Sequence, residues 1–421
     1  MPEALADRAA ASRPWPPGLT RVPYWVYQDP DVLEAEQTRL FQGPVWNYLC
    51  LEAEIPAPGD WRTTFAGRMP VVVVRTETGA LAAFENRCAH RGALICLDTA
   101  GRGAKGFTCV YHAWRYDLCG VPQSVAFGRG IDGKGGMADS FRLAEHGPRR
   151  LRVASFCGLV FGTLDPVLAP FEDWIGPEIA ARVRRVLRRP VEVIGRYTQA
   201  LPNNWKLYVE NVKDTYHASL LHLFFATFRI TRLSQGGGVV VSASGGHHVS
   251  ATRMPAPASA PASPRADASY QGLRSEDQQF RLRDPRLLEV ADEWGDDIQL
   301  QILCLFPGFV LQQIHNSVAV RQVLPRGVAE TDLHWTLLGF VDDPPDLRAR
   351  RLRQANLVGP AGFVSMEDGC VGGFVQRGAA AAGEQMSVIE MGGTEADTQD
   401  TRATEASVRG FWKQWRATMG I

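Results

Sequence analysis

Two short motifs in the first third of the chain each combine one cysteine with one histidine. One pairs Cys88 with His90 and the other pairs Cys109 with His112, with eighteen residues between the motifs. Four such side chains can hold one metal centre only if two loops face each other, and this demand restricts the local fold more than any other feature of the sequence. We therefore expect this part of the chain to be organised around a metal centre.

The spacing of the four residues distinguishes two kinds of centre. Zinc modules usually place like ligands together, as a pair of cysteines followed by a pair of histidines. A two-iron, two-sulfur cluster with mixed ligation takes both cysteines on one iron and both histidines on the other, so each loop gives one ligand to each iron. The alternation in this chain fits the second arrangement. Because imidazole replaces thiolate, such a cluster carries less negative charge and has a higher reduction potential. Zinc remains the alternative.

Composition limits the partners of the protein. The 421 residues contain 45 Lys+Arg and 45 Asp+Glu, so no excess of basic charge indicates nucleic acid or anionic lipid. The N-terminal residues lack the apolar core of a signal peptide, and no apolar run approaches the ~20 residues of a membrane span. We expect a soluble cytoplasmic protein that binds a small molecule. In a reducing cytosol, Cys/His clusters indicate metal sites rather than disulfides.

The chain is too long for one compact core, and its patterns divide it. After an N-terminal segment at 1–43, residues 44–165 alternate short strands with Gly-bearing turns, which predicts a small all-β domain that carries both motifs. Residues 166–421 mix helical spacing with alternating strands, which predicts a curved antiparallel sheet with helices, the helix-grip arrangement. The Ala/Pro/Ser-rich stretch 254–269 predicts a mobile surface loop. The expected fold class is α+β.

A second group of ligand-type residues lies in the segment ENVKDTYHASLLH, which holds Asp214, His217 and His222. Two imidazoles and one carboxylate on one face of an iron form the facial triad of oxygen-activating non-haem Fe(II) sites. On a regular helix, positions five apart point about 140° from each other. Both histidines therefore reach one iron only if the helix ends, bends or carries a π-type irregularity. Asp214 is better placed behind a ligand than on the metal, so the carboxylate ligand is expected from elsewhere.

The segments CAHRGA and CVYHAWRYDLCG, which begin at Cys88 and Cys109, resemble the two ligand loops of the large subunits of Rieske-type aromatic-ring-hydroxylating oxygenases. The family commonly has proline after the second cysteine, where this chain has Val110, a difference that leaves the ligands intact. The resemblance implies one [2Fe-2S] cluster on the four motif residues and one mononuclear Fe(II) in the larger domain. It also implies that Trp114 and Tyr116 shield the cluster or hydrogen-bond near it.

The same resemblance supplies a third iron ligand. Segment 359–376, GPAGFVSMEDGCVGGFVQ, is similar to the family's third-ligand segment, and residue matching places the ligand at Asp368 with Glu367 as the rival. Without the resemblance, this stretch reads as a solvated turn. Asp214 matches the family's bridging aspartate, which links the iron ligand His217 to a Rieske histidine of the neighbouring subunit. A carboxylate between two imidazoles fixes both tautomers and shortens the electron path. The bridge implies a ring of subunits, commonly three.

Arg321 lies in the alternating segment NSVAVRQVLP, among apolar neighbours on either face of the predicted strand. An inward Arg321 would need an anion such as an aromatic carboxylate, whereas an outward one would face solvent from an edge strand, and the pattern alone leaves both open. In the related terephthalate enzymes a matching arginine holds a substrate carboxylate, which implies this role for Arg321. A second arginine near the pocket mouth matches Arg402. The adjacent His247 and His248 point to opposite faces of a strand, so we expect structural or pocket-lining roles for them.

From residue 20 to residue 412, the chain resembles the large subunits of terephthalate 1,2-dioxygenase, anthranilate 1,2-dioxygenase and salicylate 5-hydroxylase. The implied function is the catalytic α subunit of a multicomponent dioxygenase that adds O2 to an aromatic carboxylate. Its electrons come from NADH through a reductase, with or without a ferredoxin. The implied assembly is α3, or α3β3 with a small β subunit.

Three alternatives stay open at this point. Within the family, the alternative is a monooxygenase similar to salicylate 5-hydroxylase. Outside it, one alternative is a plain electron-transfer iron-sulfur protein. The other is a zinc-stabilised ligand-binding module, since a curved sheet that grips a helix also serves as a container for small ligands.

Overall fold

The computed structural model describes residues 15–228, 230–254, 268, 270–273, 276, 284–359 and 363–421. Almost all of the surface loop predicted at 254–269 lies outside these residues. The chain divides into two compact units, a smaller one at Phe41–Phe171 and a larger one that joins the described residues before Phe41 to Glu172–Ile421. The N-terminal segment therefore packs with the larger unit. None of the helices in the described ranges has the length and apolar content that crossing a membrane requires.

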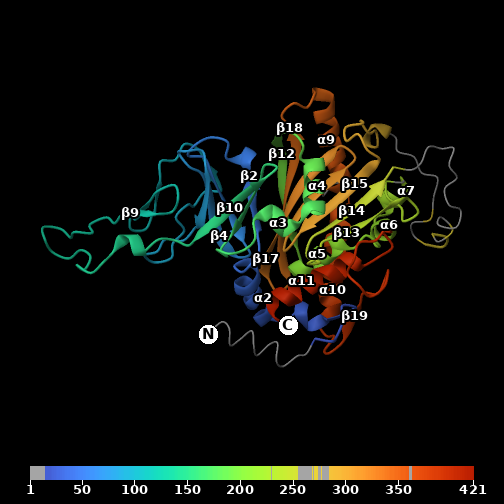
Figure 1. Cartoon of the computed structure of the whole chain (residues 1–421), viewed down its shortest axis with the longest axis horizontal. Coiled ribbons are helices and arrows are strands. Elements are labelled where there is room, and N and C mark those ends of the chain that lie inside the picture. Colours follow the sequence, from blue (N-terminus) through green and yellow to red (C-terminus); the bar gives the residue numbers. More distant parts are fainter. Residues whose placement is uncertain are drawn as a thin grey trace. The chain divides into compact units, whose positions relative to one another are not determined.

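The smaller unit contains two antiparallel sheets, drawn in blue to teal in Figure 1. The first sheet has seven strands, in the order β2 (Asn47–Leu51), β11 (Leu159–Thr163), β10 (Arg150–Phe156), β5 (Leu81–Glu85), β4 (Met69–Arg75), β3 (Trp61–Ala66) and β6 (Ala100–Gly101). The second sheet has three short strands, β7 (Phe107–Thr108), β8 (Arg115–Tyr116) and β9 (Pro122–Ser124). The small all-β domain that the sequence predicts is confirmed.

The run of four valines at 71–74 in β4 decides where the two Cys/His loops lie. The first and third valines pack in one core with Leu49 and Ala83. The second and fourth pack in another core with Phe84, Cys88 and Cys109. Since successive side chains of a strand point to opposite faces, an uninterrupted apolar strand separates two cores. Both cysteines therefore rest on one face of a central strand.

The larger unit is built on a second sheet of seven antiparallel strands. Their order is β12 (Val191–Leu201), β18 (Glu330–Phe340), β17 (Ser317–Gly327), β16 (Phe309–Ile314), β15 (Ile298–Leu305), β14 (His248–Arg253) and β13 (Gly237–Val241). A separate two-stranded sheet pairs β1 (Arg21–Pro23) with β19 (Met386–Val388). From β13 to β18 each strand lies beside its neighbour in sequence, and β12 closes the far edge.

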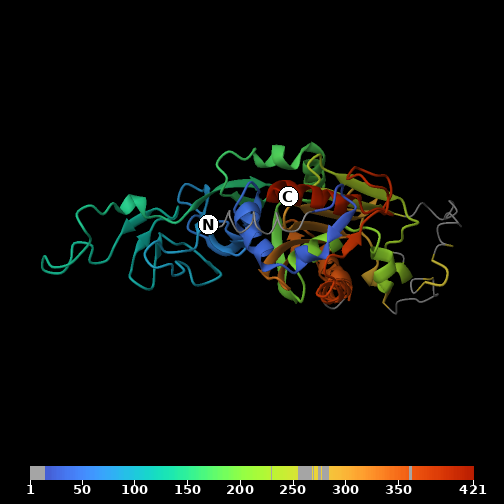
Figure 2. The ribbon, with the colours of Figure 1, turned by 90° about the horizontal axis from the view of Figure 1, so that it is seen from below.

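Helices cover both faces of this sheet. In Figure 2, α4 (green) and α9 (orange) lie on opposite sides of it. Gln301 of β15 donates from Nε2 to the carbonyl oxygen of Arg182 in α4 at 3.1 Å, whereas its neighbours Leu300 and Ile302 line a pocket on the other face. The helices are α2 (Pro30–Glu36), α3 (Phe171–Ile175), α4 (Pro177–Val186), α5 (Trp205–Lys213), α6 (Ala218–Leu221), α7 (Leu223–Thr227), α9 (Pro345–Val358), α10 (Val364–Ala379) and α11 (Ala406–Met419). The mixed α+β fold is as predicted.

A buried ion pair fixes α5 against the N-terminal and C-terminal helices. Lys206 of α5 and Glu36 of α2 lie 2.8 Å apart, and neither side chain is exposed. The indole N–H groups of Trp205 and Trp415 also donate to the Glu36 carboxylate, at 2.8 and 2.9 Å. Such a pair is tolerated only when hydrogen bonds replace the lost water, and here they do. The N-terminal segment thus helps to hold the helix that leads into the His217 segment.

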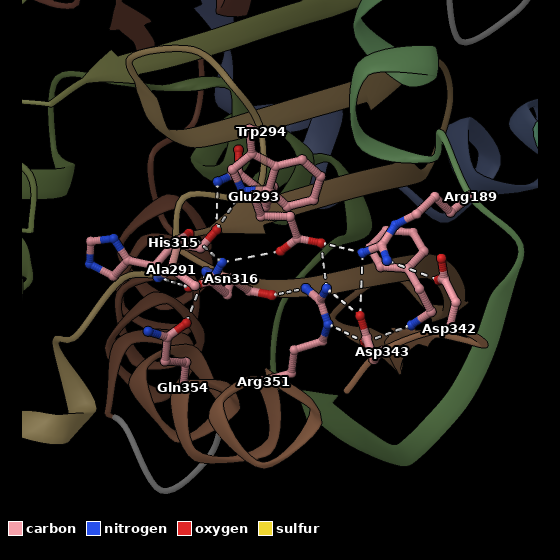
Figure 3. A network of polar contacts seen from close by, with 12 residues as sticks. Arg189, Ala291, Glu293, Trp294, His315, Asn316, Asp342, Asp343, Arg351 and Gln354 are labelled. Atoms are coloured by element: carbon pink, nitrogen blue, oxygen red, sulfur yellow. Dashed lines mark hydrogen bonds and ion pairs between the residues drawn. The ribbon is translucent and has the colours of Figure 1, made fainter. Parts of the chain in front are cut away.

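A second buried network anchors α9, as Figure 3 shows. Arg351 of α9 donates from Nε to Asp343 at 2.6 Å, and it also bonds Glu293 and the carbonyl oxygen of Asn316. Arg189, which precedes β12, donates to Glu293 at 2.7 Å. The Arg351 side chain is fully buried. Burial opposes ionisation of Asp343, but hydrogen bonds from Arg351 outweigh it and lower the pKa of Asp343 below its usual value. The network therefore joins α9 to the turns at the ends of β16 and β18.

The segment that reads as one long helix is broken where the two histidines lie. Helix α5 ends at Lys213, and Asp214 is extended, with ψ 114°. His217 then precedes α6, and His222 follows it. The expectation that a regular helix cannot run through both histidines is confirmed, because the break frees the two imidazoles from the 140° separation of a continuous helix.

Candidate metal centres

Two tight turns hold the Cys/His loops of the smaller unit. In the first, the amide of Cys88 donates to the carbonyl of Ala93 at 2.8 Å, and the amide of Gly92 donates to the carbonyl of Cys88 at 3.0 Å. In the second, Cys109 exchanges backbone hydrogen bonds with Trp114 and Ala113. Gly92 adopts φ 76°, a left-handed conformation that glycine accepts without strain. Each turn brings its cysteine and histidine to one side of the loop.

The structure brings the four predicted residues into one cluster with a clear polarity. Cys88 and Cys109 are both 2% exposed, whereas His90 is exposed and His112 partly so. The two imidazole rings lie edge to face with centroids 4.4 Å apart. Within the described residues, no three of these four have ligand atoms within 4.8 Å of one another, as a single zinc ion would require. The donor set and its spread fit a two-iron cluster.

Uncharged groups contact Cys88 and His90 at this candidate cluster site, while charged side chains, among them Arg87 and Arg91, line the surface pocket beside them. The hydroxyl of Tyr116 donates to Sγ of Cys88 at 3.2 Å and accepts from the amide of Ala89 at 3.1 Å. Trp114 stacks on the ring of His90, with centroids 5.3 Å apart. Sequence reasoning missed Asn86, whose side-chain oxygen accepts from the amides at 95 and 96 and so ties down the far end of the first loop. Its position at the end of β5 gave no signal for this role.

In the larger unit, His217, His222 and Asp368 converge. Nε2 of His217 lies 3.5 Å from Oδ1 of Asp368, and Nε2 of His222 lies 3.3 Å from the same oxygen. One ligand atom from each of the three residues lies within 4.8 Å of the other two. Among the described residues, no other group of three His, Cys, Asp or Glu side chains meets this distance. Two imidazoles and one carboxylate match the donor set of a facial-triad iron site.

A further polar side chain contacts each of these three residues, behind the ring for the two histidines and at Oδ1 for Asp368. Nδ1 of His217 lies 3.1 Å from Asp214, and Nδ1 of His222 lies 2.8 Å from Glu367. Both imidazoles are thereby oriented with Nε2 toward Asp368, because a carboxylate beside Nδ1 holds a proton on that nitrogen. The amide of Asn211 donates to Asp368 at 3.1 Å. Sequence reasoning missed Asn211 and treated Glu367 only as a rival ligand.

The local electrostatics favour an ionised carboxylate at the centre. Burial opposes ionisation of Asp368, but His222 and His217 outweigh it and hold the pKa of Asp368 well below its usual value. Burial lowers the pKa of His217, but the carboxylates of Asp214 and Asp368 outweigh it and raise this pKa to about 10. A cluster that binds protons this firmly at its nitrogens also has the charge to bind a divalent cation in their place.

A pocket opens beside this group, and together with the open solvent at its mouth it includes about 670 Å³ of space. Cross-strand partners point to the same face of a sheet, and Ser250, Ile302 and Gln312 form one such row on β14, β15 and β16. The apolar part of the lining consists of Val212, Ala218, Phe225, Leu300, Ile302, Ile314, Val358 and Val364. The polar part includes both arginines singled out in the sequence, Arg321 and Arg402.

Arg321 points inward, which the pattern of its strand left open. Its Nη1 donates to the hydroxyl of Tyr208 at 2.7 Å, its Nη2 donates to Gln312, and its guanidinium lies 4.5 Å from the ring centroid of Trp335. Arg321 is 5% exposed, and no described carboxylate pairs with it. Three buried N–H groups here lack an acceptor among the described residues, namely Nε of Arg321, Nε2 of Gln312 and Nε1 of Trp335.

Arg402 enters the pocket from another side. It is also 5% exposed, and it donates to the Thr231 hydroxyl at 2.6 Å and to the carbonyl oxygens of Arg232 and Gln235. Its Nε and the hydroxyl of Thr252 have no hydrogen-bond partner in the ranges that the structure covers. Burial lowers the pKa of Arg402 to about 10. The two buried arginines thus share one pocket, and neither forms an ion pair with a carboxylate of the described residues.

The adjacent histidines lie outside the pocket lining and contact opposite sides of the sheet, as the strand geometry predicts. His247 packs against Trp174 of α3 and accepts from the amide of Phe306 at 3.2 Å. His248 lies 3.4 Å from the Lys213 amine. Burial lowers the pKa of His247 to about 3 and that of Lys213 to about 8. These contacts support structural roles.

Two family models match the chain. Residues 45–128 match the Rieske [2Fe-2S] domain, and residues 184–421 match the ring hydroxylating alpha subunit (catalytic domain). The chain belongs to the ring-hydroxylating oxygenase α subunits. The cofactors of this α subunit are accordingly one [2Fe-2S] cluster and one mononuclear non-haem iron. Electrons from NADH arrive through a reductase, and ferredoxins also serve the family.

Curated relatives agree over nearly the whole length. The α subunit is 58% identical over 403 residues to terephthalate 1,2-dioxygenase, terminal oxygenase component subunit alpha 2, from Comamonas sp., covering 95% of this chain and 96% of that one. It is 44% identical to the anthranilate 1,2-dioxygenase large subunit of Burkholderia cepacia, with 95% and 94% covered. It is 40% identical to the large oxygenase component of salicylate 5-hydroxylase from Ralstonia sp., with 96% of each covered.

The fold agrees with solved structures. Naphthalene 1,2-dioxygenase from Rhodococcus sp. superimposes with a TM-score of 0.76 at 22% identity, covering 99% of this chain and 96% of that one. The predicted family, fold and enzyme class are confirmed. The plain electron-transfer protein and the zinc-stabilised module are wrong, because the larger unit is itself the catalytic domain of an oxygenase.

Proposed function

We propose that this α subunit dihydroxylates a benzene ring that carries carboxylates at opposite ends, as terephthalate does. The proposal rests on two buried arginines, Arg321 and Arg402, that share one pocket and pair with no described carboxylate. A buried cation without a counter-ion is costly, so the pocket favours a ligand that brings an anion to each of them. The relative with 58% identity is named for terephthalate, which supports the same substrate class.

The sheet topology supports a pocket with two cationic ends. Arg321 is on β17, while the segment that leads to Arg402 joins the edge strand β13 through a bridge between Val239 and Gln399. Four strand spacings separate β17 from β13, roughly 19 Å at about 4.8 Å each. Two long side chains that reach inward from that separation leave space for one ring with a carboxylate at either end.

In this proposal, Cys88 and Cys109 bind one cluster iron while His90 and His112 bind the other. His217, His222 and Asp368 would hold the mononuclear iron. When bound there, the iron supplies the reductive activation of O2. The apolar lining holds the ring and excludes water, and the arginines fix which ring edge faces the metal. The overall change consumes the ring, O2, two electrons and two protons, and it yields a cis-diol.

We further propose that Asp214 carries electrons between subunits of an α3 or α3β3 assembly. Its side chain is 23% exposed at the edge of the pocket, and its carboxylate already contacts Nδ1 of His217. In the smaller unit, His90 is exposed in the same way. A carboxylate between two such imidazoles links the two centres by a short path. Asp214→Asn should leave both centres loaded and stop turnover.

A single-turnover experiment tests the substrate class. The protein is reduced chemically without air and given ¹⁸O-labelled O2 with terephthalate, anthranilate, salicylate or benzoate, and products are identified by mass spectrometry. We expect a terephthalate cis-diol that carries both labelled atoms. Catechol from anthranilate, or one labelled atom in a hydroxylated salicylate, would replace the proposal with the corresponding enzyme. Equal oxidation of benzoate would remove the requirement for a second carboxylate.

Arginine variants test the two ends separately. Arg321→Ala and Arg402→Ala should each raise the KM for terephthalate about 100-fold or more, because a buried anion left without its partner costs roughly 2–5 kcal/mol. Arg326→Ala is the matched control, since Arg326 lies on the same strand as Arg321 but pairs with Asp332 and does not line the pocket. An unchanged KM in either variant would exclude that arginine from the site.

A further inference from the structure

Two consecutive carboxylates on α10, those of Glu367 and Asp368, contact the imidazole of His222 at its two ring nitrogens. Oδ1 of Asp368 lies 3.3 Å from Nε2 of His222, and Oε2 of Glu367 lies 2.8 Å from Nδ1 of the same ring. The first contact faces the group that converges on the metal position, and the second lies behind it. Glu367 therefore cannot serve as the ligand while it makes this bond, because its carboxylate points to the outer nitrogen.

The start of α10 explains how neighbouring residues reach opposite edges of the ring. Phe363 precedes the helix in a left-handed conformation, with φ 64°, and its carbonyl accepts from the amide of Glu367 at 2.7 Å. Adjacent positions on a helix point about 100° apart, and glutamate is one methylene longer than aspartate. The longer side chain can therefore pass around the imidazole while the shorter one stops at the near edge.

We infer that Glu367 is a positioning residue for His222. This inference rests on the proposed function, in which His222 binds the mononuclear iron. Glu367 fixes the proton on Nδ1, holds the ring plane and raises the basicity of Nε2, as outer carboxylates do for metal-bound histidines. The His222 side chain is 4% exposed and that of Glu367 is 25% exposed, so the charged partner lies at the solvent side of a buried ligand.

The comparison with His217 shows what Glu367 adds. His217 has an equivalent partner in Asp214, at 3.1 Å, but the proposed function also requires that carboxylate to contact a neighbouring subunit. The bond from His222 to Glu367 is shorter and lies within one chain. Glu367 therefore gives the iron site one firmly held histidine that does not depend on assembly, and its charge partly offsets that of the metal.

Iron affinity tests the inference directly. Wild type, Glu367→Gln, Glu367→Ala and the control Glu384→Ala are stripped of mononuclear iron and titrated with Fe(II) against a chelator. Glu384 is an exposed acid just after α10, outside the pocket lining. We expect Glu367→Ala to bind Fe(II) roughly 10- to 100-fold more weakly, with a smaller loss in Glu367→Gln, whose amide oxygen still accepts from Nδ1. The control should bind as wild type does.

Spectroscopy and a parallel variant separate the possible failures. The ferrous nitrosyl EPR signal of Glu367→Ala should change shape, because the His222 ring is released, while the EPR signal of the reduced cluster stays the same. Unchanged affinity, or a fall in affinity matched by loss of apo-protein stability, would overturn the positioning role. Asp368→Ala is measured alongside. If that variant also keeps its iron, the proposed iron site is wrong rather than the role of Glu367.

Discussion

The two candidate iron centres are supported in opposite ways. In the smaller unit, the groups that contact Cys88 and His90 are a tyrosine hydroxyl, an indole ring and backbone amides, and the charged residue next to His90 is a cation, Arg91. In the larger unit, His217 and His222 each have a carboxylate behind them. An iron-sulfur cluster already has anionic sulfur ligands, so further negative charge beside it would lower its potential. A single Fe(II) with two neutral imidazoles gains from outer carboxylates, which fix the tautomers and raise ligand basicity.

The largest expected effect is loss of one centre without the other. Cys109→Ser should abolish the visible absorption and the reduced EPR signal of the cluster, because a serine hydroxyl does not ionise to replace the buried thiolate. The mononuclear site should still titrate with Fe(II). Cys119→Ser is the control, since Cys119 is not one of the four proposed cluster ligands and is only partly buried. If Cys109→Ser also lost the mononuclear iron, the two metal centres would depend on each other.

Removal of the buried cation of α9 should destabilise only the larger unit. Arg351→Met leaves Arg189 as the remaining arginine beside the buried Asp343 and Glu293, so the loss should lie near the lower end of the roughly 3–5 kcal/mol that a broken buried pair typically costs. Unfolding by urea, followed by tryptophan fluorescence, measures the change, and cluster absorbance reports on the smaller unit. Arg348→Met on the same helix is the control, because its partly exposed pair with Glu192 should contribute about 1 kcal/mol or less. Equal effects of the two substitutions would contradict the importance of burial.

The larger unit should also respond to pH through Glu210 of α5. Burial raises the pKa of Glu210 to about 7, against hydrogen bonds from Trp412 and Tyr27 that lower it. The folded state therefore holds this proton more tightly than the unfolded state, whose value is near 4.5. The resulting stability is complete below about pH 4.5 and is lost as the pH rises to about 7. Glu210→Gln should remove this loss from the pH dependence of the unfolding free energy, and parallel curves for variant and wild type would disprove it.

The smallest expected effect concerns the neutral support of the cluster. Tyr116→Phe removes the hydrogen bond from the hydroxyl to Sγ of Cys88. Since hydrogen bonds to sulfur stabilise the reduced cluster, the reduction potential should fall while the cluster remains bound. A redox titration followed by EPR measures this. An unchanged potential would mean that the hydroxyl serves only to hold the amide of Ala89.

Local patterns predicted the parts of the molecule that local geometry controls. The Cys/His spacing indicated a mixed-ligand cluster, because two short turns alone place each thiol beside its imidazole. The five-residue separation of His217 and His222 predicted a break in the helix, and α5 does end at Lys213. The direction of Arg321 could not be predicted, because β17 is an interior strand buried on both faces from Ser317 to Pro325. Alternation carries no information on such a strand.

The sequence by itself indicated the family and predicted the two-domain division and the ligand residues of both centres, because short motifs along the chain carry these features. Only the tertiary structure decided what stands behind each ligand. Glu367 contacts His222 from 145 residues away in the chain. Arg321 and Arg402 line one pocket only because the sheet brings their strand and loop together. Contacts of that range depend on how α10 packs on α5 and on the order of the strands, and no local pattern encodes either.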